Sequence, residues 1–509
     1  MIATTKRLFH KADLQVTWNT DNLVLKLAVG YLLLPYFLFF WGWLRLPAAI
    51  IFILVIGFSY WQFTRQVNRD IPQTPVYKLN WVVLFIGLCV IGFWLLYSGV
   101  GHFADQLPDY KKHNLILSQL MNQDWPVIQK VTNKKGYILV YYFAYYLPEA
   151  LVGKVFGMST AQIFQFVYSF LGLLLVFYFV YTVVGKKQLL TVTFVFILFG
   201  GMDALGELLL SGTMPNLFHL SEKWATLFIY QGNTEFLYWV PQHALPGWLA
   251  TLIFLYMVLN HVGKRYAIFV WSLTIFWSPW VFIGMLPLVA YLIFDSIKDV
   301  KMFFSLTNIL PVFLIISTCV YFFSINEASV QFNYWVWEKS PDWLGKYIAF
   351  VLVEFLLLGL VLFIINANNK VIRELLALVT FTLLIIPLYH MGRLNDFCMR
   401  ASIPAIVVLS IISIYSMAAI IRQNFTRISG LPHLLLRCIL GLGFLFSMSM
   451  IASAIEQTKA NHGGLFYEYS VPYQKHLLHA FEETFSESIM EQYVTRGIEY
   501  PKYHWLFKF

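Results

Sequence analysis

The chain has 509 residues, of which 59% are apolar, 18% aromatic and only 12% charged. Soluble domains contain about 45–50% apolar and about 25% charged residues, so this composition excludes an ordinary globular protein and predicts a polytopic membrane protein. The formal net charge of +9 does not indicate a nucleic-acid partner, because the basic residues are spread over many short segments instead of forming one patch.

The apolar segments predict an all-α fold with about 13 transmembrane helices, because a crossing helix needs about 20 mostly apolar residues. The first apolar segment begins near Leu23 and lacks a small-residue cleavage site, so we expect a retained span rather than a signal peptide. The predicted spans cover residues 23–43, 47–64, 80–99, 161–184, 189–210, 243–260, 266–279, 281–296, 302–324, 347–367, 374–390, 402–421 and 433–455. The spans 266–279 and 281–296 meet the length criterion least well, since each is short.

Basic residues lie in alternate connections between these spans, and the positive-inside rule therefore predicts a cytoplasmic N-terminus in a cell membrane. These connections carry Lys6, Arg7 and Lys11; Arg65, Arg69 and Lys78; Lys186 and Lys187; Lys264 and Arg265; Lys298 and Lys301; Lys370 and Arg373; and Arg422 and Arg427. The outer face receives the loops near 100–160, 211–242, 325–346 and 391–401. We expect one transmembrane domain, 1–455, and a small extracytoplasmic C-terminal segment, 456–509, that packs on the outer loops.

Two carboxylates, Asp105 and Asp109, follow closely after a predicted span. Charged groups at the edge of the bilayer are costly to keep there, so this pair is the first candidate for chemistry. Leu115, Leu117 and Leu120 recur at roughly helical spacing and predict a short amphipathic helix along the membrane, with Asp109 at its start. A helix cap is the alternative role for Asp109.

The segment from Tyr137 to Leu147 is apolar and rich in tyrosine, but it is followed by Pro148 and Glu149. Counting it as a span would place every later basic loop on the outer face. We therefore expect a helix lying in the interface, with its tyrosines at the level of the lipid headgroups.

Asp203 and Glu207 lie at the outer end of the predicted span 189–210. They are four residues apart and so on one face of a helix, where they could bind an acceptor hydroxyl or a cation. Glu235 is expected to be solvated. His243 lies between two prolines at the start of a span, and either binds a phosphate or hydroxyl group or is a structural histidine.

The last outer loop, 391–401, contains Arg393, Asp396 and Arg400. Guanidinium groups bind phosphate oxygens in a bidentate manner, so the two arginines predict recognition of an anionic headgroup. The alternative is an ion pair that only closes the loop. Phosphate binding is favoured because one aspartate cannot neutralise both arginines.

The sequence contains no convincing nucleotide phosphate-binding loop, zinc-protease helix or Cys-His ligand spacing. ATP-driven transport and zinc hydrolysis are therefore not predicted, and we expect no metal and no cofactor; a divalent metal has no support from the residues. Broken helices with paired charges at mid-bilayer depth, which are typical of secondary transporters, are also not indicated.

From Asp109 to about Lys187 the order of features resembles the GT-C glycosyltransferases, polytopic enzymes that use polyprenyl-phosphate-linked sugars on the outer face. The resemblance consists of an acidic residue after a span, an interfacial helix, the Trp125-Pro126 element, the tyrosine-rich piece and a long span. It covers about eighty residues. Two extra spans precede the loop, the acidic pair is Asp-x-x-x-Asp, and the large soluble C-terminal domain of some members is missing.

The resemblance implies a glycosyltransferase that modifies a cell-envelope glycan or lipid acceptor, with Asp109 as catalytic base and Asp105 as the fallback. We expect Arg393, Arg400 and His243 to bind the donor phosphate, and His113, Asp203, Glu207 and Asp396 to bind acceptor or substrate. A transporter or flippase for a lipid-linked or amphiphilic substrate is the alternative, with Glu354 as its clearest intramembrane acid. A glycan polymerase or ligase is a third possibility, although its polar residues would be expected in one large late loop.

Overall fold

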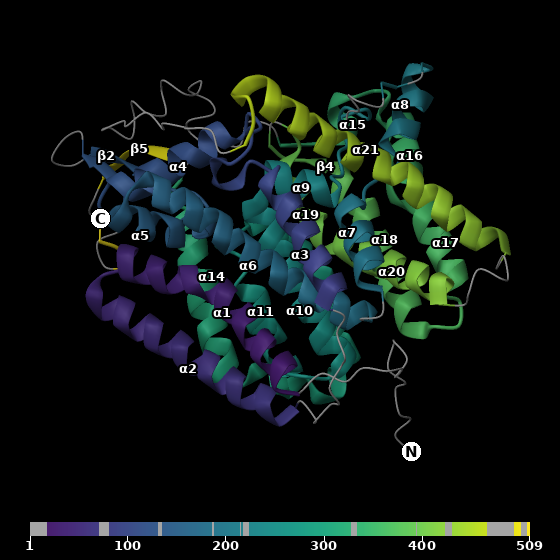
Figure 1. Ribbon diagram of the computed structural model, residues 1–509. Helices are drawn as coiled ribbons and strands as arrows, with labels where there is room; N and C mark the ends of the chain where they lie inside the picture. Colours follow the sequence, from purple (N-terminus) through teal and green to yellow (C-terminus); the bar gives the residue numbers. More distant parts are fainter. Residues whose placement is uncertain are drawn as a thin grey trace.

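The structure is a computed structural model that describes residues 18–70, 81–130, 135–185, 188–213, 215–216, 223–326, 333–392, 394–422, 430–465, 493–499 and 506–508. Within these ranges, nine helices are long and apolar enough to cross a membrane, and a tenth is added if a pair bent by 116° counts as one span. The molecule is therefore a multi-pass, mainly helical membrane protein, as the composition predicts (Figure 1).

Seven of the long segments are single helices: α1 (Trp18–Trp43), α2 (Leu46–Asp70), α6 (Met158–Val184), α10 (Pro241–Asn260), α14 (Leu306–Phe323), α18 (Lys370–Ile385, extended by η7, Ile386–Leu388) and α21 (Gly430–His462). Two are composite: α7 (Leu189–Leu198) continues as α8 (Asp203–Ser211), and α16 (Trp343–Val351) continues through the π-helical turn η6 (Leu352–Leu356) into α17 (Leu357–Ile365). Two apolar helices are shorter, α3 (Trp81–Leu96) and α20 (Ile403–Arg422). The first member of the bent pair is the segment formed by α12 (Pro279–Gly284) and α13 (Leu286–Asp295), and the second is η5 (Ile297–Phe304).

Every predicted span except 266–279 coincides with one of these helices. That segment forms η4 (Lys264–Tyr266) and the short α11 (Ala267–Ser272), and then continues in turns to Trp277. It still connects two opposite faces, because Lys264 pairs with Asp295 at 3.5 Å at one end, whereas Ser278 Oγ lies 2.7 Å from His243 Nδ1 at the other. The total of thirteen spans stays a prediction.

The remaining elements lie mainly at the upper end of the molecule in Figure 1. They are η1 (Val100–His102), α4 (Tyr110–Asn122), η2 (Ala144–Tyr146), α5 (Leu147–Phe156), α9 (Asn233–Trp239), α15 (Val336–Lys339) and α19 (Asp396–Ala401). Two small antiparallel sheets accompany them: β1 (Ile128–Lys130), β2 (Lys135–Leu139) and β5 (Val494–Glu499) in the order β1-β2-β5, and β3 (Tyr334–Trp335) with β4 (Tyr389–His390).

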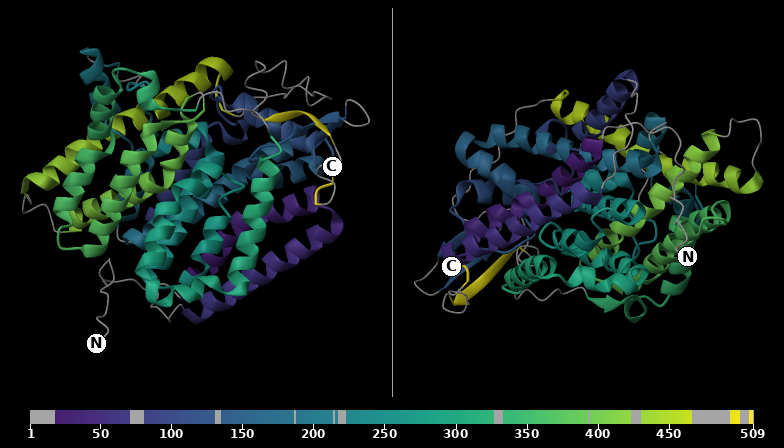
Figure 2. Two further views of the ribbon diagram at one scale, coloured as in Figure 1. Left: turned by 180° about the vertical axis from the view of Figure 1, so that it is seen from behind. Right: turned by 90° about the horizontal axis from the view of Figure 1, so that it is seen from below.

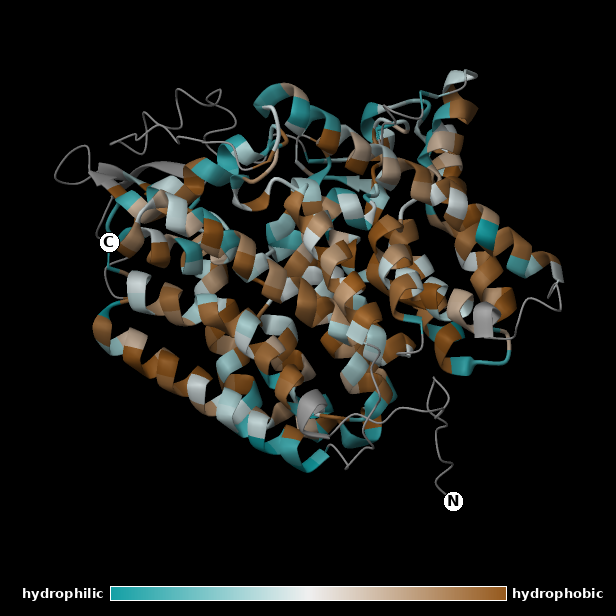
Figure 3. Cartoon of the chain, in the orientation of Figure 1, coloured by the Kyte–Doolittle hydropathy of each residue, from teal (hydrophilic) through white to brown (hydrophobic). Residues whose placement is uncertain are grey.

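Contacts between loops gather at two opposite ends of the helical bundle. At the end predicted to be outside, His462 Nε2 lies 2.7 Å from Asp105 Oδ1, and β3 joins the third outer loop to the fourth. At the other end, the Gly263 N–H donates to Asp70 Oδ2 at 2.8 Å. Apolar residues fill the middle of the helices between these ends (Figure 3). The contacts agree with the predicted alternation of loops, while the absolute orientation stays a prediction.

A cluster of aromatic rings connects helix α1 with Phe507 near the C-terminus. Phe39 of α1 packs against Phe276, with ring centroids 4.4 Å apart, and against Phe322 of α14 at 5.1 Å. Phe507, almost the last residue, is fully buried in the same cluster, and its backbone pairs with Leu44. Both views of Figure 2 accordingly place the C-terminal end beside the N-terminal helices.

The prediction of an interfacial helix over 137–147 is wrong. Its first residues form β2, the next ones are irregular with a bend at Tyr141, and only Ala144–Tyr146 form a 3₁₀ turn. Tyr145 and Tyr146 are 1% exposed, so they face the protein interior and not the lipid headgroups. Tyrosine and β-branched residues favour strands when a partner strand is present, and β1 and β5 supply two partners that local periodicity could not reveal.

Helix α4 forms where predicted, but it does not lie with an apolar face on the membrane. Every residue from His113 to Met121 is buried, because α5 and neighbouring elements cover the helix. The exposed apolar face belongs to α5 instead, where Val155 and Phe156 are 67% and 68% exposed. The interfacial element of the first outer loop is therefore α5.

Candidate functional site

Asp109 stands immediately before α4, at the position of a helix cap. Among the described residues its side chain makes no capping hydrogen bond, and its backbone is already helical. Its carboxylate instead accepts a hydrogen bond from Lys112 Nζ at 2.6 Å, one helical turn further on. The geometry does not support the capping role and leaves the carboxylate partly exposed, at 30% of its side-chain surface.

Asp109 is held in its ionised form by the basic groups around it. Burial alone would raise the pKa of its carboxyl group, but the charges of Lys112, His113 and Arg400 together outweigh burial and lower that pKa. The influence of Arg400 is informative, because this residue lies almost three hundred positions away in the sequence. The first and the last of the predicted outer loops therefore meet at Asp109.

His113 is fixed by protein contacts through both ring nitrogens. Nε2 lies 3.2 Å from the carbonyl oxygen of Trp239, and Nδ1 contacts the hydroxyl of Tyr146. Burial and the charge of Lys112 lower the pKa of the imidazole to about 3, so the ring is neutral. A carbonyl can only accept, so Nε2 carries the proton and Nδ1 accepts from Tyr146. Neither nitrogen remains for a substrate, and His113 positions α4 against α9 rather than binding an acceptor.

His243 occupies the first turn of α10, which begins at Pro241 because proline suits the first helical position. The ring is fully buried and packs on Tyr142, with centroids 4.9 Å apart. Nδ1 is 2.7 Å from Ser278 Oγ, whereas Nε2 has no hydrogen-bond partner among the described residues. One buried nitrogen is thus available for a ligand, as the phosphate-binding prediction requires.

Arg400 ends the short helix α19, whose start is fixed by Asn395. The side chain of Asn395 accepts from Cys398 N–H at 3.3 Å and donates to Leu227 O at 3.1 Å. Asp396 follows in the first turn, and its carboxylate lies 2.6 Å from the guanidinium of Arg400. Arg400 is 7% exposed and Asp396 34%. Although burial opposes its charge, the carboxylate raises the pKa of Arg400, so the guanidinium is cationic.

The ion pair with Asp396 does not use all the donors of Arg400. Its Nε is buried and has no hydrogen-bond partner among the described residues. Arg400 and Lys112 also lie close enough to His243 to act on it electrostatically. Arg393, the second predicted arginine, lies outside the described residues.

Asp109, Lys112, Tyr142, His243, Asp396 and Arg400 are linked by electrostatic influences, and we use the name basic cleft for this group of side chains alone, without implying a cavity. It combines one ionised, partly exposed carboxylate with buried cationic or neutral nitrogen donors whose capacity is incompletely used. Such an arrangement can bind an anion such as phosphate and place a base beside it. Within the described ranges no group of three or more His, Cys, Asp and Glu side chains has the geometry of a metal site.

The contacts of Asp105 that the described residues show are with α21 and not with the basic cleft. Its carboxylate pairs with His462 at the end of α21, and its backbone N–H donates to Thr458 Oγ1 at 3.0 Å. These contacts attach the first outer loop to α21. The geometry therefore favours Asp109 over Asp105 as the candidate base.

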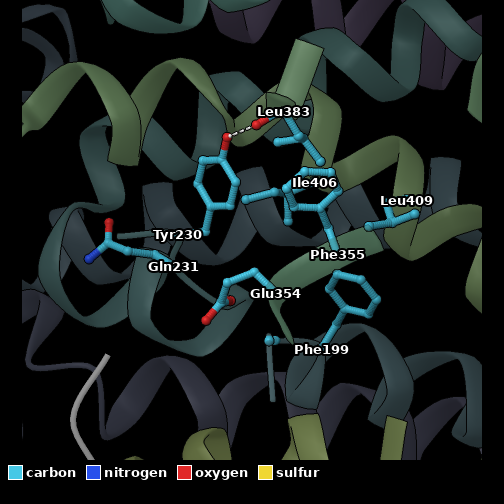
Figure 4. A pocket seen from close by; sticks show the side chains of 10 residues that line it. Phe199, Tyr230, Gln231, Glu354, Phe355, Leu383, Ile406 and Leu409 are labelled. Carbon is cyan, nitrogen blue, oxygen red and sulfur yellow. Dashed lines mark hydrogen bonds between the residues drawn. The ribbon is translucent and has the colours of Figure 1, made fainter. Parts of the chain in front are cut away.

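Asp203 and Glu207 belong to a second, acidic group. The predicted single helix breaks at Gly200 and Gly201, so Asp203 begins α8. Asp203 is 2% exposed and faces Glu354 of η6, while Trp224 Nε1 donates to Glu354 Oε1 at 3.0 Å. The Glu354 side chain borders a cavity of about 20 Å³, large enough for one water molecule (Figure 4).

Glu235 joins this acidic group from α9, contrary to the expectation that it is solvated. It is 8% exposed, and burial together with Asp203 raises the pKa of its carboxyl group well above the usual value, although Arg400 opposes the shift. Glu235 therefore lies between the acidic group and the basic cleft. No sequence spacing relates it to Asp203, because the two residues belong to α8 and α9, which both pack against α21.

Three residues in or beside the basic cleft were not selected from the sequence. Lys112 could have been found, because it follows Asp109 by three positions and must share its helix face. No spacing in the sequence relates Tyr142 or Ser278 to the other residues of the basic cleft. Their role depends on β2 pairing and on the turn that ends near Ser278, which bring them to His243.

Gly284 of α12 provides a test of how firmly Arg400 is positioned. A Cβ atom at this position would overlap the backbone carbonyl of Ala401, which follows Arg400. We expect Gly284→Ala to force α12 and α19 apart and to destabilise the protein by about 1–3 kcal/mol, the usual cost of overpacking. Thermal unfolding of the purified protein would measure the change.

Gly441→Ala is the matched control, because no described atom lies within 4 Å of a Cβ built at this helical glycine. It should leave the unfolding midpoint equal to or above that of the wild type. Equal midpoints for the two variants would contradict the close approach of α12 and α19.

Comparisons with known proteins give no further assignment. No protein-family model matches the chain, and neither the curated proteins nor the solved structures yielded a significant match. The function must therefore be inferred from the sequence and from the geometry of the basic cleft.

Proposed function

We propose that the protein is a membrane glycosyltransferase that transfers a sugar from a polyprenyl-phosphate-linked donor to a cell-envelope glycan or lipid on the outer face. The observation that carries this proposal is the pair Arg400 and His243. Both are buried, Arg400 lies within electrostatic reach of Asp109 and of His243, and each of the two has a nitrogen without a hydrogen-bond partner among the described residues. An unpaired buried polar group costs about 1–3 kcal/mol, so a ligand that supplies oxygen acceptors is strongly favoured there.

A phosphate ester fits this environment better than a neutral ligand does. Its oxygens can accept from the free donors of Arg400 and His243, and its charge complements Arg400 and Lys112. A polyprenyl chain would extend from the phosphate into the bilayer next to the exposed apolar face of α5. The cationic donors and the exposed apolar face of α5 are the features that support a donor of this class.

In the proposed reaction Asp109 takes the proton from an acceptor hydroxyl while the hydroxyl oxygen attacks the anomeric carbon. The new bond joins that oxygen to the anomeric carbon, and the bond between the carbon and the phosphate oxygen breaks. Its electron pair leaves with the polyprenyl phosphate, whose additional negative charge is stabilised by Arg400 and His243. The sugar is transferred, and the proton remains on Asp109 until solvent removes it.

Lys112 has a second part in this proposal. In the free protein it neutralises Asp109, which makes the carboxylate a weak base. An anionic donor competes for the ammonium group. Once Lys112 turns toward the phosphate, the burial of Asp109 acts without that opposing charge and raises its pKa toward the range that suits a general base.

The proposal includes a GT-C-like fold with about 13 spans and a cytoplasmic N-terminus, as the charge pattern predicts. It is supported by the meeting of three outer loops at Asp109, His243 and Arg400, which are remote in sequence. Asp203 and Glu207 remain candidates for acceptor binding, because Glu235 connects their group to Arg400.

The direct test is turnover by the purified full-length protein in lipid nanodiscs. Polyprenyl-phosphate-linked hexoses and pentoses are supplied one at a time with an envelope lipid extract, and released polyprenyl phosphate is quantified. We expect release from at least one donor, together with a new glycosylated product. A protein that releases polyprenyl phosphate from none of them, while remaining folded, contradicts the proposal.

A transporter of a lipid-linked substrate is favoured by one observation, the buried acidic group of Asp203, Glu235 and Glu354. Buried acids among membrane helices often mark ion or substrate pathways. Reconstituted vesicles with a labelled donor in one leaflet discriminate the two functions. Transbilayer movement without a new glycosidic bond would favour the transporter, and bond formation without movement the transferase.

A further inference from the structure

The C-terminal segment is attached to the protein at two separate places. At the first place, β5 pairs with β2 in antiparallel register from Leu139↔Val494 to Lys135↔Glu499. The Val140 N–H also donates to the carbonyl of Tyr493 at 2.9 Å. Near its end, the Arg45 N–H donates to Leu506 O at 2.9 Å, and the Lys508 N–H donates to Trp43 O at 2.8 Å.

This attachment delivers Tyr493 to the basic cleft. Tyr493 is 5% exposed, and its ring centroid lies 4.8 Å from that of Tyr141. Tyr141 packs against Tyr142 at 3.7 Å, and Tyr142 packs on His243. The rings form a continuous row that ends at the nitrogen available to a ligand. Asp109, Asp396 and Arg400 are also close enough to act electrostatically on Tyr493.

The donor's covalent structure restricts where its sugar can lie. The anomeric carbon is bonded directly to a phosphate oxygen, so the sugar ring begins one bond from the group held by Arg400 and His243. Asp109 must approach the same carbon from the opposite side, with the acceptor hydroxyl between them. Tyr142, which is half-buried, and the buried Tyr493 offer flat apolar faces and hydroxyl groups in this neighbourhood.

We propose that Tyr142 and Tyr493 form the subsite for the transferred sugar, and that the C-terminal segment is therefore part of the active site rather than an accessory cap. Aromatic faces can pack against the apolar C–H surface of a sugar, while phenol groups donate to and accept from its hydroxyls. This inference rests on the proposed function, since it assumes a sugar attached to the bound phosphate.

The test compares two ligands that differ only in the sugar. Binding of polyprenyl phosphate and of the polyprenyl-phosphate sugar that the wild type turns over is measured in nanodiscs. For Tyr493→Ala we expect affinity for the sugar-linked donor to fall about tenfold or more, as the loss of a hydrogen bond and ring contact implies. Affinity for polyprenyl phosphate should be unchanged. Tyr493→Phe, which keeps the ring, should lie between wild type and Tyr493→Ala.

Tyr137→Ala is the control, because Tyr137 lies on β2 but outside the row of rings that reaches His243. It should leave both affinities at the wild-type values. Unaltered binding of both ligands by Tyr493→Ala would overturn the inference, and so would an equal loss for both, which would indicate a structural role. If Tyr493→Ala does not fold, Tyr142→Phe gives the same comparison by removing one hydroxyl.

The two proposals fail in different ways. A wild-type protein that releases polyprenyl phosphate from no donor contradicts the transferase function itself. A wild-type protein that is active, accompanied by a Tyr493→Ala variant with unchanged donor selectivity, contradicts only the sugar subsite.

Discussion

Replacing Asp109 with asparagine is expected to lower the rate of sugar transfer by about 10²- to 10⁴-fold, the usual contribution of a positioned general base. Asparagine has nearly the same shape but cannot accept the proton of the acceptor hydroxyl. Folding should survive, because Asp109 makes no capping hydrogen bond among the described residues and its ion pair with Lys112 is partly exposed. Such pairs contribute about 0–1 kcal/mol. Release of polyprenyl phosphate by wild type and variant would be measured side by side.

Asp105→Asn is the matched control, since it makes the same change four residues earlier in the same loop. Its carboxylate pairs with His462 rather than with the basic cleft, and asparagine can keep a hydrogen bond there. Transfer by this variant should stay within a few-fold of wild type. Full activity of Asp109→Asn, or an equal loss in both variants, would remove Asp109 from the role of base.

The pH dependence adds a second readout for Asp109. Lys112, His113 and Arg400 lower its pKa in spite of burial, so the carboxylate stays ionised until the pH falls below its usual value of about 4. The stability from its ion pair is therefore present above that value and is lost as the pH falls through the lowered pKa. Donor-independent unfolding measured against pH should show no Asp109-dependent loss between about pH 5 and 8, when wild type and Asp109→Asn are compared.

Much of the architecture was predictable, because membrane helices are specified by long apolar segments and by the charges between them. The helix after Asp109 and the polar outer loops could be found for the same reason. The choice of site residues was also limited, because only 12% of the residues are charged and few of them lie in the predicted outer loops. Asp109, His243 and Arg400 were identified individually from these patterns.

Their convergence could not be predicted, because it depends on packing between segments that are far apart in the chain. The tyrosine-rich segment illustrates this limit. Its pattern permits an interfacial helix, but pairing with β1 and β5 makes its first residues extended and turns its tyrosines inward. Glu235 was misjudged for a related reason, since its burial results from contacts of α9 that its own neighbours do not indicate.

The second large effect is expected at Arg400. Arg400→Gln removes the cation that is proposed to stabilise the departing phosphate, and loss of one such group from an active site lowers kcat by about 10²- to 10³-fold. The affinity for polyprenyl phosphate should fall as well. Because Asp396 is 34% exposed, it can be hydrated once its partner is gone, so the fold should persist. Arg400→Lys keeps the charge but not the planar fork, and should recover only part of the activity.

Arg373→Gln is the appropriate control, because Arg373 is a surface arginine at the opposite end of the bundle that donates to the carbonyl of Ala367. It should bind polyprenyl phosphate and turn over donor as the wild type does. Titration with polyprenyl phosphate separates the two alternative roles of Arg400. If it only closes its loop through Asp396, Arg400→Gln will lower the unfolding temperature without weakening phosphate binding, and the basic cleft is then no donor site. A loss of phosphate affinity at an unchanged unfolding temperature is the outcome that we expect, because Arg400 Nε and His243 Nε2 have no hydrogen-bond partner in the part of the chain that the structure describes.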